Sequence, residues 1–254
     1  MTIIDEVGKN FIKQTKYKNM GSSAQDQGAP ASEYLQSAKP GSKIIGLPEP
    51  SGIDLVSFDL RKAIEERRSI RRYRQEPISL DELSYLLWLT QGVKKVSQKH
   101  GVTLRTVPSA GARHPFETYF SINRVSDLEP GLYHFLAEEH KLEITKLGSE
   151  INQQLTKATL NQKHVETSAV TFIWVAIPYR TSWRYGARAY RYIHLDAGHV
   201  CQNLYLAAES IDCGVCAIGA YDDDAVNALL DIDGIEQFAI YLASLGKKAE
   251  PKEN

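Results

Sequence analysis

One stretch constrains the fold more than any other, the run Ala-Val-Thr-Phe-Ile-Trp-Val-Ala-Ile at residues 169–177. It is apolar at nearly every position, it does not alternate with polar residues, and Pro178 ends it. A strand of this kind is buried on both faces, because a solvent-facing side would carry polar residues at alternate positions. The sequence therefore predicts a central strand covered on both sides, and 254 residues are enough to build one such core.

The segments around this strand mix hairpins with helices. Residues 116–122 are aromatic and β-branched, and residues 131–136 and 141–147 flank Glu138-Glu139, which predicts a strand and then an antiparallel hairpin. Ser79 and Glu82 form a capping box, which predicts a helix that ends near Gly92. Helical spacing predicts the longest helix at 185–210, and strand, helix and strand follow at 215–218, 222–230 and 238–245. This order predicts an α+β fold and not a doubly wound parallel sheet.

The first 58 residues differ from the rest of the chain. Residues 19–52 are rich in Gly, Ser, Ala, Gln and Pro, and only Ile44, Ile45 and Leu47 offer a local apolar anchor. A segment of this kind cannot build its own core, so it is either disordered or an extended arm that lies on another surface. We favour the arm, and we expect a boundary between an arm at 1–58 and a folded domain at 59–254.

Composition and charge exclude several classes of protein. The sequence has 30 Lys and Arg against 31 Asp and Glu, a net charge of −1, so no overall basic field draws in nucleic acid or an anionic membrane. No apolar run reaches the roughly 18 to 20 residues of a membrane span, and the first residues do not resemble a secretory signal. Three cysteines do not form the disulfide framework of a small secreted domain. We therefore expect a cytoplasmic protein without a nucleic-acid or membrane partner.

A basic motif, Arg-Arg-Ser-Ile-Arg-Arg-Tyr at residues 67–73, places four arginines and a serine just after a short predicted helix that Asp59 can cap. Guanidinium groups bind phosphate oxygens in a bidentate manner, and the Ser69 hydroxyl can add a hydrogen bond, so a phosphate is the natural partner. The alternative is a solvated basic turn in which the arginines pair with Glu65, Glu66 and Glu76. The motif by itself leaves both open.

A second candidate is the loop Thr-Val-Pro-Ser-Ala-Gly-Ala-Arg-His-Pro at residues 106–115. Small residues let the backbone approach a planar ligand closely, and the prolines restrict its path. The alternative is a tight connection into the following strand. The sequence contains neither Gly-x-Gly-x-x-Gly nor the Gly-x-x-x-x-Gly-Lys-Ser/Thr of a P-loop, so the usual dinucleotide and nucleoside triphosphate sites are not indicated.

The sequence gives little support for a metal site. Cys213-Gly-Val-Cys216 has the spacing of redox pairs and of half a zinc site, but a second pair is missing and apolar Ala217-Ile218 follows. We therefore interpret these cysteines as buried, small apolar residues, with a redox or metal role as the alternative. His194 and His199 are five residues apart, unlike the i, i+4 histidines of a zinc helix. We expect no metal.

Taken in order, five segments resemble the nitroreductase superfamily, and within it the SagB-type dehydrogenase branch. They are the motif at 67–71; the helix at 80–88 with Gln91-Gly92; the loop at 105–115; residues 128–134; and residues 185–191, continued through 196–199, 202–203 and 218–222. The resemblance implies an α+β sandwich around a mostly antiparallel sheet flanked by helices. It also implies a homodimer that binds one FMN at each of two sites built from both subunits.

The resemblance also assigns residues to the FMN. Arg67, Arg68, Ser69 and Arg71 fall on phosphate-binding positions. The loop expected at the flavin ring, usually supplied by the partner subunit, comprises Pro108, Ser109, Ala110, Gly111 and Ala112, and His114 falls where many relatives carry Gln. Ala217, Ile218 and Gly219 fall on the segment along the opposite side of the ring. Lys247 or Lys248 could reach the phosphate, and we choose Lys248.

The resemblance implies an FMN-dependent oxidoreductase, with hydride transfer from NAD(P)H to an electron-poor organic acceptor as the default reaction. One alternative is dehydrogenation of a heterocycle in a peptide or small molecule, and another is a flavin-binding protein without turnover. Peptide-azoline oxidases of this branch use a Lys-Tyr pair in substrate deprotonation, and Arg184-Tyr185 stands at the matching place. Arginine stays protonated and cannot act as a general base, so this departure counts against azoline chemistry, while Tyr185 remains usable; both residues are catalytic candidates. We also expect the arm to wrap the partner subunit or to cover the flavin entrance.

Overall fold

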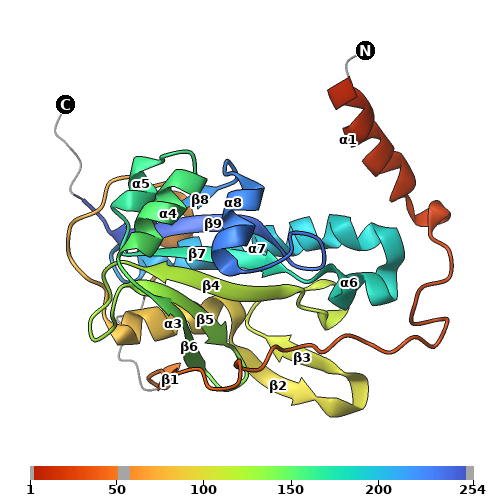
Figure 1. Cartoon of the computed structure of the whole chain (residues 1–254), viewed down its shortest axis with the longest axis horizontal. Helices are drawn as coiled ribbons and strands as arrows, with labels where there is room; N and C mark the ends of the chain where they lie inside the picture. Colours follow the sequence, from red (N-terminus) through yellow and green to blue (C-terminus); the bar gives the residue numbers. More distant parts are fainter. Residues whose placement is uncertain (1–2, 51–57, 250–254) are drawn as a thin grey trace.

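A computed structural model describes residues 3–50 and 58–249, and its centre is a seven-stranded sheet. The strand order is β1-β6-β5-β4-β7-β9-β8, and every neighbouring pair is antiparallel. The strands are β1 (Ile44–Gly46), β4 (Phe116–Ile122), β5 (Gly131–Leu136), β6 (Lys141–Leu147), β7 (Val170–Ala176), β8 (Cys213–Ile218) and β9 (Phe238–Lys247). Figure 1 shows helices on both sides of this sheet, so the predicted α+β architecture is confirmed.

Strand β7 lies inside the sheet, as its apolar sequence predicts. All seven of its residues are buried, and it pairs with β4 on one side and β9 on the other. Phe172 contacts Phe120 of β4 and Trp174 contacts Tyr241 of β9, with ring centroids 6.0 Å apart in both pairs. The strand carries no polar face because helices cover both sides of it.

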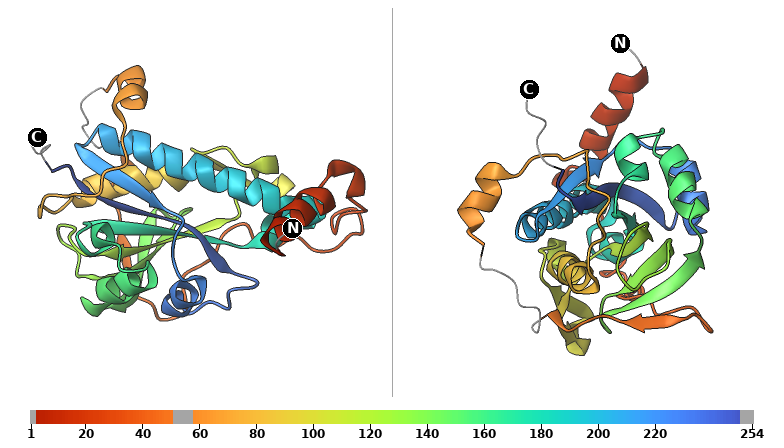
Figure 2. Two further views of the ribbon diagram at one scale, coloured as in Figure 1. Left: turned by 90° about the horizontal axis from the view of Figure 1, so that it is seen from above. Right: turned by 90° about the vertical axis from the view of Figure 1, so that its left-hand side faces the viewer.

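The helices form one layer on each face of the sheet (Figure 2). Helices α3 (Leu80–Gln91) and α7 (Ala189–Glu209) bury their apolar residues in the larger core cluster. Helices α4 (Glu150–Ala158), α5 (Lys163–Glu166) and α8 (Asp223–Leu230) bury theirs in the smaller cluster on the other face. Short helix α2 (Leu60–Glu66) precedes the basic motif and projects from the body.

Local signals explain where several helices begin and end. Helix α3 has the predicted capping box, in which Ser79 Oγ accepts from the Glu82 amide and the Glu82 carboxylate accepts from the Ser79 amide. Pro178 ends β7 and occupies the first turn of α6 (Pro178–Tyr185). Gly186, with φ of +51°, separates α6 from α7, so the single helix predicted from residue 185 was wrong at its start.

The N-terminal segment packs against the folded domain of the same chain. It contains helix α1 (Ile3–Gln14), which the sequence did not predict, and strand β1, whose Ile45 pairs with Leu142 of β6. The apolar anchor at residues 44–47 therefore adds an edge strand to the sheet. Residues 51–57 lie outside the described residues, so the expected boundary near residue 58 stays a prediction.

Two remaining strands form a separate hairpin that the sequence did not predict. Strands β2 (Val93–Ser97) and β3 (Val102–Arg105) pair in an antiparallel manner, and the 3-10 helix Gln98–His100 joins them. The hairpin leads directly into the loop at residues 106–115. Within residues 3–50 and 58–249, no helix is both long and apolar enough to cross a membrane.

Candidate functional site

The basic motif is attached to the edge of the sheet. The Ile70 amide donates to the Val215 carbonyl of β8 at 2.8 Å, and Ser69 forms a parallel bridge with Val215. The hydroxyl of buried Tyr73 lies 2.8 Å from both the Ile70 carbonyl oxygen and Ser244 Oγ. This anchoring gives the motif a fixed backbone, although it has no regular secondary structure of its own.

Tyr205 of α7 joins the motif to the end of β8. Its hydroxyl lies 3.0 Å from Ser69 Oγ and accepts the Ala217 amide at 2.9 Å. The guanidinium carbon of Arg67 lies 5.2 Å from the centroid of the Tyr205 ring, a cation–π contact. One side chain thus brings together the predicted phosphate-binding motif and the predicted segment 217–219.

The acidic residues that could neutralise this motif pair with other cations. Glu65 pairs with Arg61 at 2.9 Å, Glu66 lies 4.0 Å from Lys62, and Glu76 pairs with Arg74 at 3.1 Å. Among the described residues, no carboxylate lies within 4.0 Å of the arginines at positions 67, 68, 71 and 72. The pairing with these glutamates that the solvated-turn alternative assumed is therefore not formed, and the binding of a phosphate by the arginines stays a prediction.

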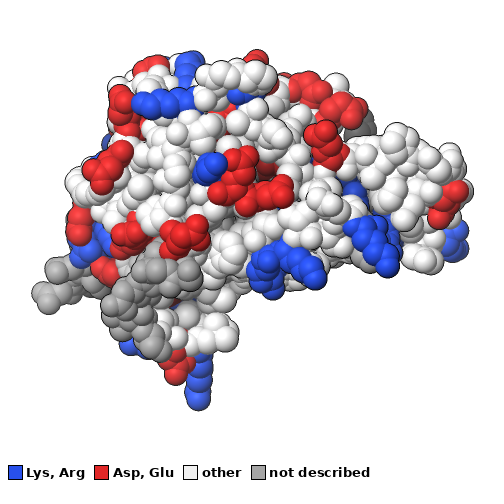
Figure 3. All heavy atoms as spheres, turned by 90° about the horizontal axis from the view of Figure 1, so that it is seen from below, with Lys and Arg blue, Asp and Glu red and all other residues white. Residues whose placement is uncertain are grey.

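Charged side chains of both signs are distributed over one face of the molecule (Figure 3). On the face drawn in Figure 3, basic and acidic side chains form separate small groups, and no continuous basic surface is visible there. This distribution agrees with the net charge of −1. An extended polyanion such as nucleic acid would find few favourable contacts on that face, whereas one phosphate group needs only a few converging donors.

The two C-terminal lysines differ in their surroundings. Lys248 Nζ pairs with Glu209 at 2.5 Å and lines a pocket of about 480 Å³ together with Arg68 and Arg74. Lys247 is buried, where its ammonium contacts Glu82 and donates to the Ile211 carbonyl at 3.0 Å. Of the two, Lys248 therefore lies beside the arginine motif, and its contact with a phosphate stays a prediction.

The small-residue loop has a constrained backbone. Gly111, Ala112 and His114 all have positive φ angles, of +60°, +53° and +44°. Ser109 Oγ donates to the carboxylate of Asp196 at 2.6 Å and accepts the His114 amide at 2.9 Å. Burial raises the pKa of Asp196, and the hydrogen bond from Ser109 partly offsets that rise. The loop is thus tied to the first half of α7 rather than being only a connection.

His114 differs from its neighbours because its side chain is enclosed by its own chain. Burial, and then the charge of Arg105, lowers its pKa to about 3, so the ring is neutral. Pro108 and Gly111 are exposed in the same loop, and Ser109, Ala110 and Ala112 are partly exposed. The loop therefore presents small side chains and backbone outward, and the contact of His114 with a flavin stays a prediction.

Tyr185, the predicted catalytic residue, lies against this loop. A Cβ atom at Gly111 would overlap the Tyr185 hydroxyl, so only glycine allows this close approach. Tyr192 of α7 packs edge-on against the Tyr185 ring at 5.0 Å, and the Arg184 guanidinium lies 5.6 Å from the ring centroid. The phenol is therefore held at the loop expected beside the flavin.

Helix α7 separates the predicted residues into two groups. Asp196 holds the loop at 108–112, and Tyr205, nine residues further on, holds the arginine motif and Ala217. At 1.5 Å per residue these attachment points lie roughly 13 Å apart along the helix. One chain thus brings together residues 67–71 with 217–219 and Lys248, but it holds the loop and Tyr185 at the other end of the helix.

Sequence reasoning missed the two α7 side chains that organise these groups. Tyr205 falls at an apolar position of the helix, and its spacing gives no sign that its hydroxyl bonds two distant segments. Asp196 is a buried carboxylate among mainly apolar positions of the helix. A charged residue at such a position is a sequence signal that could have indicated a functional or structural role.

The cysteines behave as predicted for small buried residues. Cys201, Cys213 and Cys216 are free thiols with their side chains buried. Burial raises the pKa of Cys213 to about 12, which suppresses the reactive thiolate. Within the described part of the chain, no group of three or more His, Cys, Asp or Glu side chains is arranged to hold a metal ion.

Comparison with known proteins identifies the fold family. The family model "Nitroreductase family" matches residues 64–247. The chain belongs to the nitroreductase family. Protein MJ1384 of Methanocaldococcus jannaschii, provisionally named a nitroreductase, is 34% identical over 197 residues, which are 78% of this chain and 95% of that protein. The trifolitoxin-processing protein TfxB of Rhizobium leguminosarum is 29% identical over 133 residues.

Solved structures agree on the fold. A provisionally named nitroreductase from Anabaena variabilis superposes with a TM-score of 0.68 at 28% identity over 83% of this chain and 42% of that one. A chain of the Escherichia coli microcin synthetase McbBCD complex superposes with a TM-score of 0.60 over 98% of both chains, at 16% identity. This chain spans 36% of TfxB and 42% of the Anabaena structure, so those proteins contain much that has no counterpart here.

Proposed function

We propose that this member of the nitroreductase family is a homodimeric, FMN-dependent oxidoreductase that passes a hydride from NAD(P)H to an electron-poor organic acceptor. The observation that carries the proposal is the arginine motif, whose described surroundings offer no carboxylate within 4.0 Å and which Tyr205 joins to Ala217. Several guanidinium groups on an anchored backbone, without a carboxylate partner and beside the end of β8, suit a phosphate attached to a planar ring.

Different residues of the chain would bind different parts of FMN. When bound, FMN would accept a hydride and donate it again. Arg67, Arg68, Ser69 and Arg71 would bind the phosphate, with Lys248 as a further cation. Residues 217–219 would lie along one side of the ring. The loop of a partner subunit, residues 108–112, would lie along the other side and exclude water.

Tyr185 is the proposed proton-handling residue at the reaction site. Its hydroxyl contacts Gly111 of the loop, and the ring is held by Tyr192 and by the guanidinium of Arg184. A phenol can donate a proton to an acceptor that has received a hydride. Arg184 stays charged and would act through its field and its hydrogen bonds, not as a base.

The decisive experiment measures FMN binding and reduction. Purified protein is expected to be yellow or to take up FMN, and anaerobic mixing with NADH or NADPH should bleach the flavin. The double variant R68Q/R71Q should weaken FMN binding by at least an order of magnitude, since each charge-assisted hydrogen bond contributes about 1.5–3 kcal/mol. R61Q is the matched control, because Arg61 is exposed and pairs with Glu65.

Two results would redirect the proposal. A colourless protein that does not bind FMN would overturn it. Tight FMN binding without bleaching by either nucleotide would instead indicate a flavin-binding protein without turnover.

The similarity to TfxB over 51% of this chain favours one second candidate, dehydrogenation of a heterocycle in a peptide. Bleaching of bound FMN by an azoline-containing peptide, in the absence of NAD(P)H, would support that candidate.

A further inference from the structure

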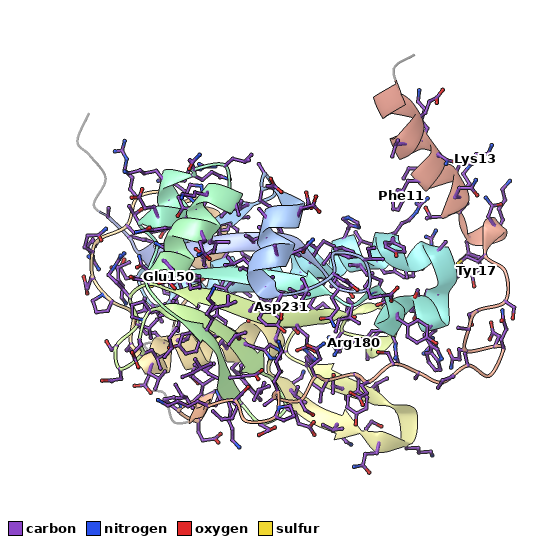
Figure 4. All side chains as sticks on the ribbon, in the orientation of Figure 1. Phe11, Lys13, Tyr17, Glu150, Arg180 and Asp231 are labelled. Carbon is purple, nitrogen blue, oxygen red and sulfur yellow. The ribbon has the colours of Figure 1, made fainter. Side chains whose placement is uncertain are left out.

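A pocket lies between the N-terminal segment and Tyr185. Its volume is about 560 Å³, and one wall consists of Arg184 and Tyr185 at the end of α6. The other wall comes from the segment after α1 and consists of Tyr17, Met20, Gly21, Ser23, Gln25 and Asp26. Figure 4 labels Tyr17 on this segment and Arg180 on α6, at the same end of the molecule. The matched family region begins only at residue 64, so this wall lies outside it, in an N-terminal extension that the structure describes at residues 3–50.

Hydrogen bonds fix this wall to the folded domain. The Gln25 amide donates to the Trp183 carbonyl at 2.8 Å, and the Trp183 indole donates to the Ala29 carbonyl at 2.7 Å. On the side nearer α1, Arg188 and Arg191 of the α6–α7 region donate to the carbonyl and hydroxyl of Thr15 at 2.8 and 2.6 Å. The pocket therefore lies between α6 and an N-terminal segment that hydrogen bonds hold to the folded domain.

Arg184 is the pocket's cation, and its charge is not neutralised nearby. Among the described residues, no carboxylate lies within 4.0 Å of it, whereas neighbouring Arg180 pairs with Glu117 at 2.5 Å. Burial, and then the charges of Arg184 and Arg180, lowers the pKa of Arg113. Stacking on the Tyr185 ring orients the Arg184 guanidinium and leaves its N–H groups available.

Asp26 is the carboxylate that lines the same pocket, and it opposes anion binding. Hydrogen bonds from the amide and the hydroxyl of Ser23 lower its pKa and hold its carboxylate against its own turn. Its charge is fixed about that turn rather than paired with Arg184. The pocket thus has a cation on the α6 wall, and the wall from the N-terminal segment carries a carboxylate together with the larger side chains of Tyr17 and Met20.

We propose that Arg184 binds a carboxylate or similar planar oxyanion carried by the acceptor, whose aromatic body contacts Tyr17, Met20 and Tyr185. This inference rests on the proposed function, because it takes the molecule in the pocket to be the electron acceptor. An anion held at Arg184 would place the attached ring beside Tyr185, whose hydroxyl contacts the loop at Gly111. The extension would then select substrates by supplying the outer wall.

Calorimetric titration of the 254-residue chain tests this with a matched pair of probes, 4-nitrobenzoate and neutral 4-nitrobenzamide. The wild type should bind the carboxylate on the order of tenfold more tightly, as expected for a charge-assisted, bidentate contact. R184Q should abolish the preference while leaving the amide's affinity unchanged, and added salt should reduce it. K163Q is the control, because Lys163 is exposed on α5 and pairs with Glu166.

D26N provides an independent sign test, because the amide side chain of this variant keeps an acceptor for Ser23 but removes the opposing charge. It should tighten binding of 4-nitrobenzoate and leave 4-nitrobenzamide unchanged. Equal affinities for the two probes in the wild type, no binding of either, or a preference that survives in R184Q would each overturn the inference. Binding is read without turnover, so failure of NAD(P)H to reduce FMN would count against the proposed function alone.

Discussion

At the scale of single residues, His134 couples the stability of the fold to pH. It is buried on β5 between two carboxylates, with Nε2 3.0 Å from Glu117 and Nδ1 3.1 Å from Glu143. Burial alone lowers the pKa of His134, but these two hydrogen bonds outweigh burial and raise the pKa to about 8. The folded-state pKa exceeds the ordinary value of 6.5, so this stabilisation is complete below pH 6.5 and is lost as the pH rises through 8.

Urea unfolding of H134Q between pH 6 and 9.5 checks this coupling. The difference in unfolding free energy from the wild type should be larger by about 2 kcal/mol at pH 6 than at pH 9.5, at 1.36 kcal/mol per pKa unit. H194Q, at an exposed position of α7, should show no such trend. Parallel pH profiles for wild type and H134Q would contradict the prediction. The sequence could not predict this group, because strand register alone brings Glu143 opposite His134.

At the scale of elements, the fit between the arginine motif and β8 depends on Gly214. A Cβ atom there would lie 2.5 Å from Ile70 Cβ, so G214A must lift the motif from β8 and weaken the hydrogen bond between Ile70 and Val215. We expect G214A to lower FMN affinity on the order of tenfold and stability by about 1–3 kcal/mol. FMN titration below the melting temperature separates these effects. G46A in β1, where a Cβ has open space, should change neither.

The sequence predicted those elements whose signals lie within a few neighbouring residues. The capping box of α3 and the apolar run of β7 act within a few residues, so the sequence predicted both. The hairpin β2–β3 contains Lys94 and Lys95 and little apolar alternation, so it was missed. Helix α1 was missed too, because the prediction of a polar arm was based on residues 19–52, which follow this helix. The motif at 67–71 was found from charge, whereas its anchor Tyr205 depends on tertiary contact.

At the scale of the whole molecule, the spacing along α7 fits the proposal that each FMN site uses residues of two chains. The loop at 108–112 and the arginine motif lie at opposite halves of this helix in one chain. An antiparallel pairing of two α7 helices about a two-fold axis would place one subunit's loop beside the other's motif. Apolar side chains are available for such an interface, with Leu195 of α7 60% exposed, and Leu60 and Ile64 of the projecting α2 64% and 54% exposed.

A charge placed at Leu195 tests this arrangement of the two subunits. L195E should convert the dimer to a monomer, because two carboxylates near the axis would be buried without partners. FMN affinity should fall with it, since the monomer keeps residues 67–71 but loses the partner's loop. Analytical ultracentrifugation and FMN titration measure the two effects, and I235E, at a position 73% exposed before β9, is the control. A monomeric L195E that binds FMN as tightly as the wild type would show that each site is complete within one chain.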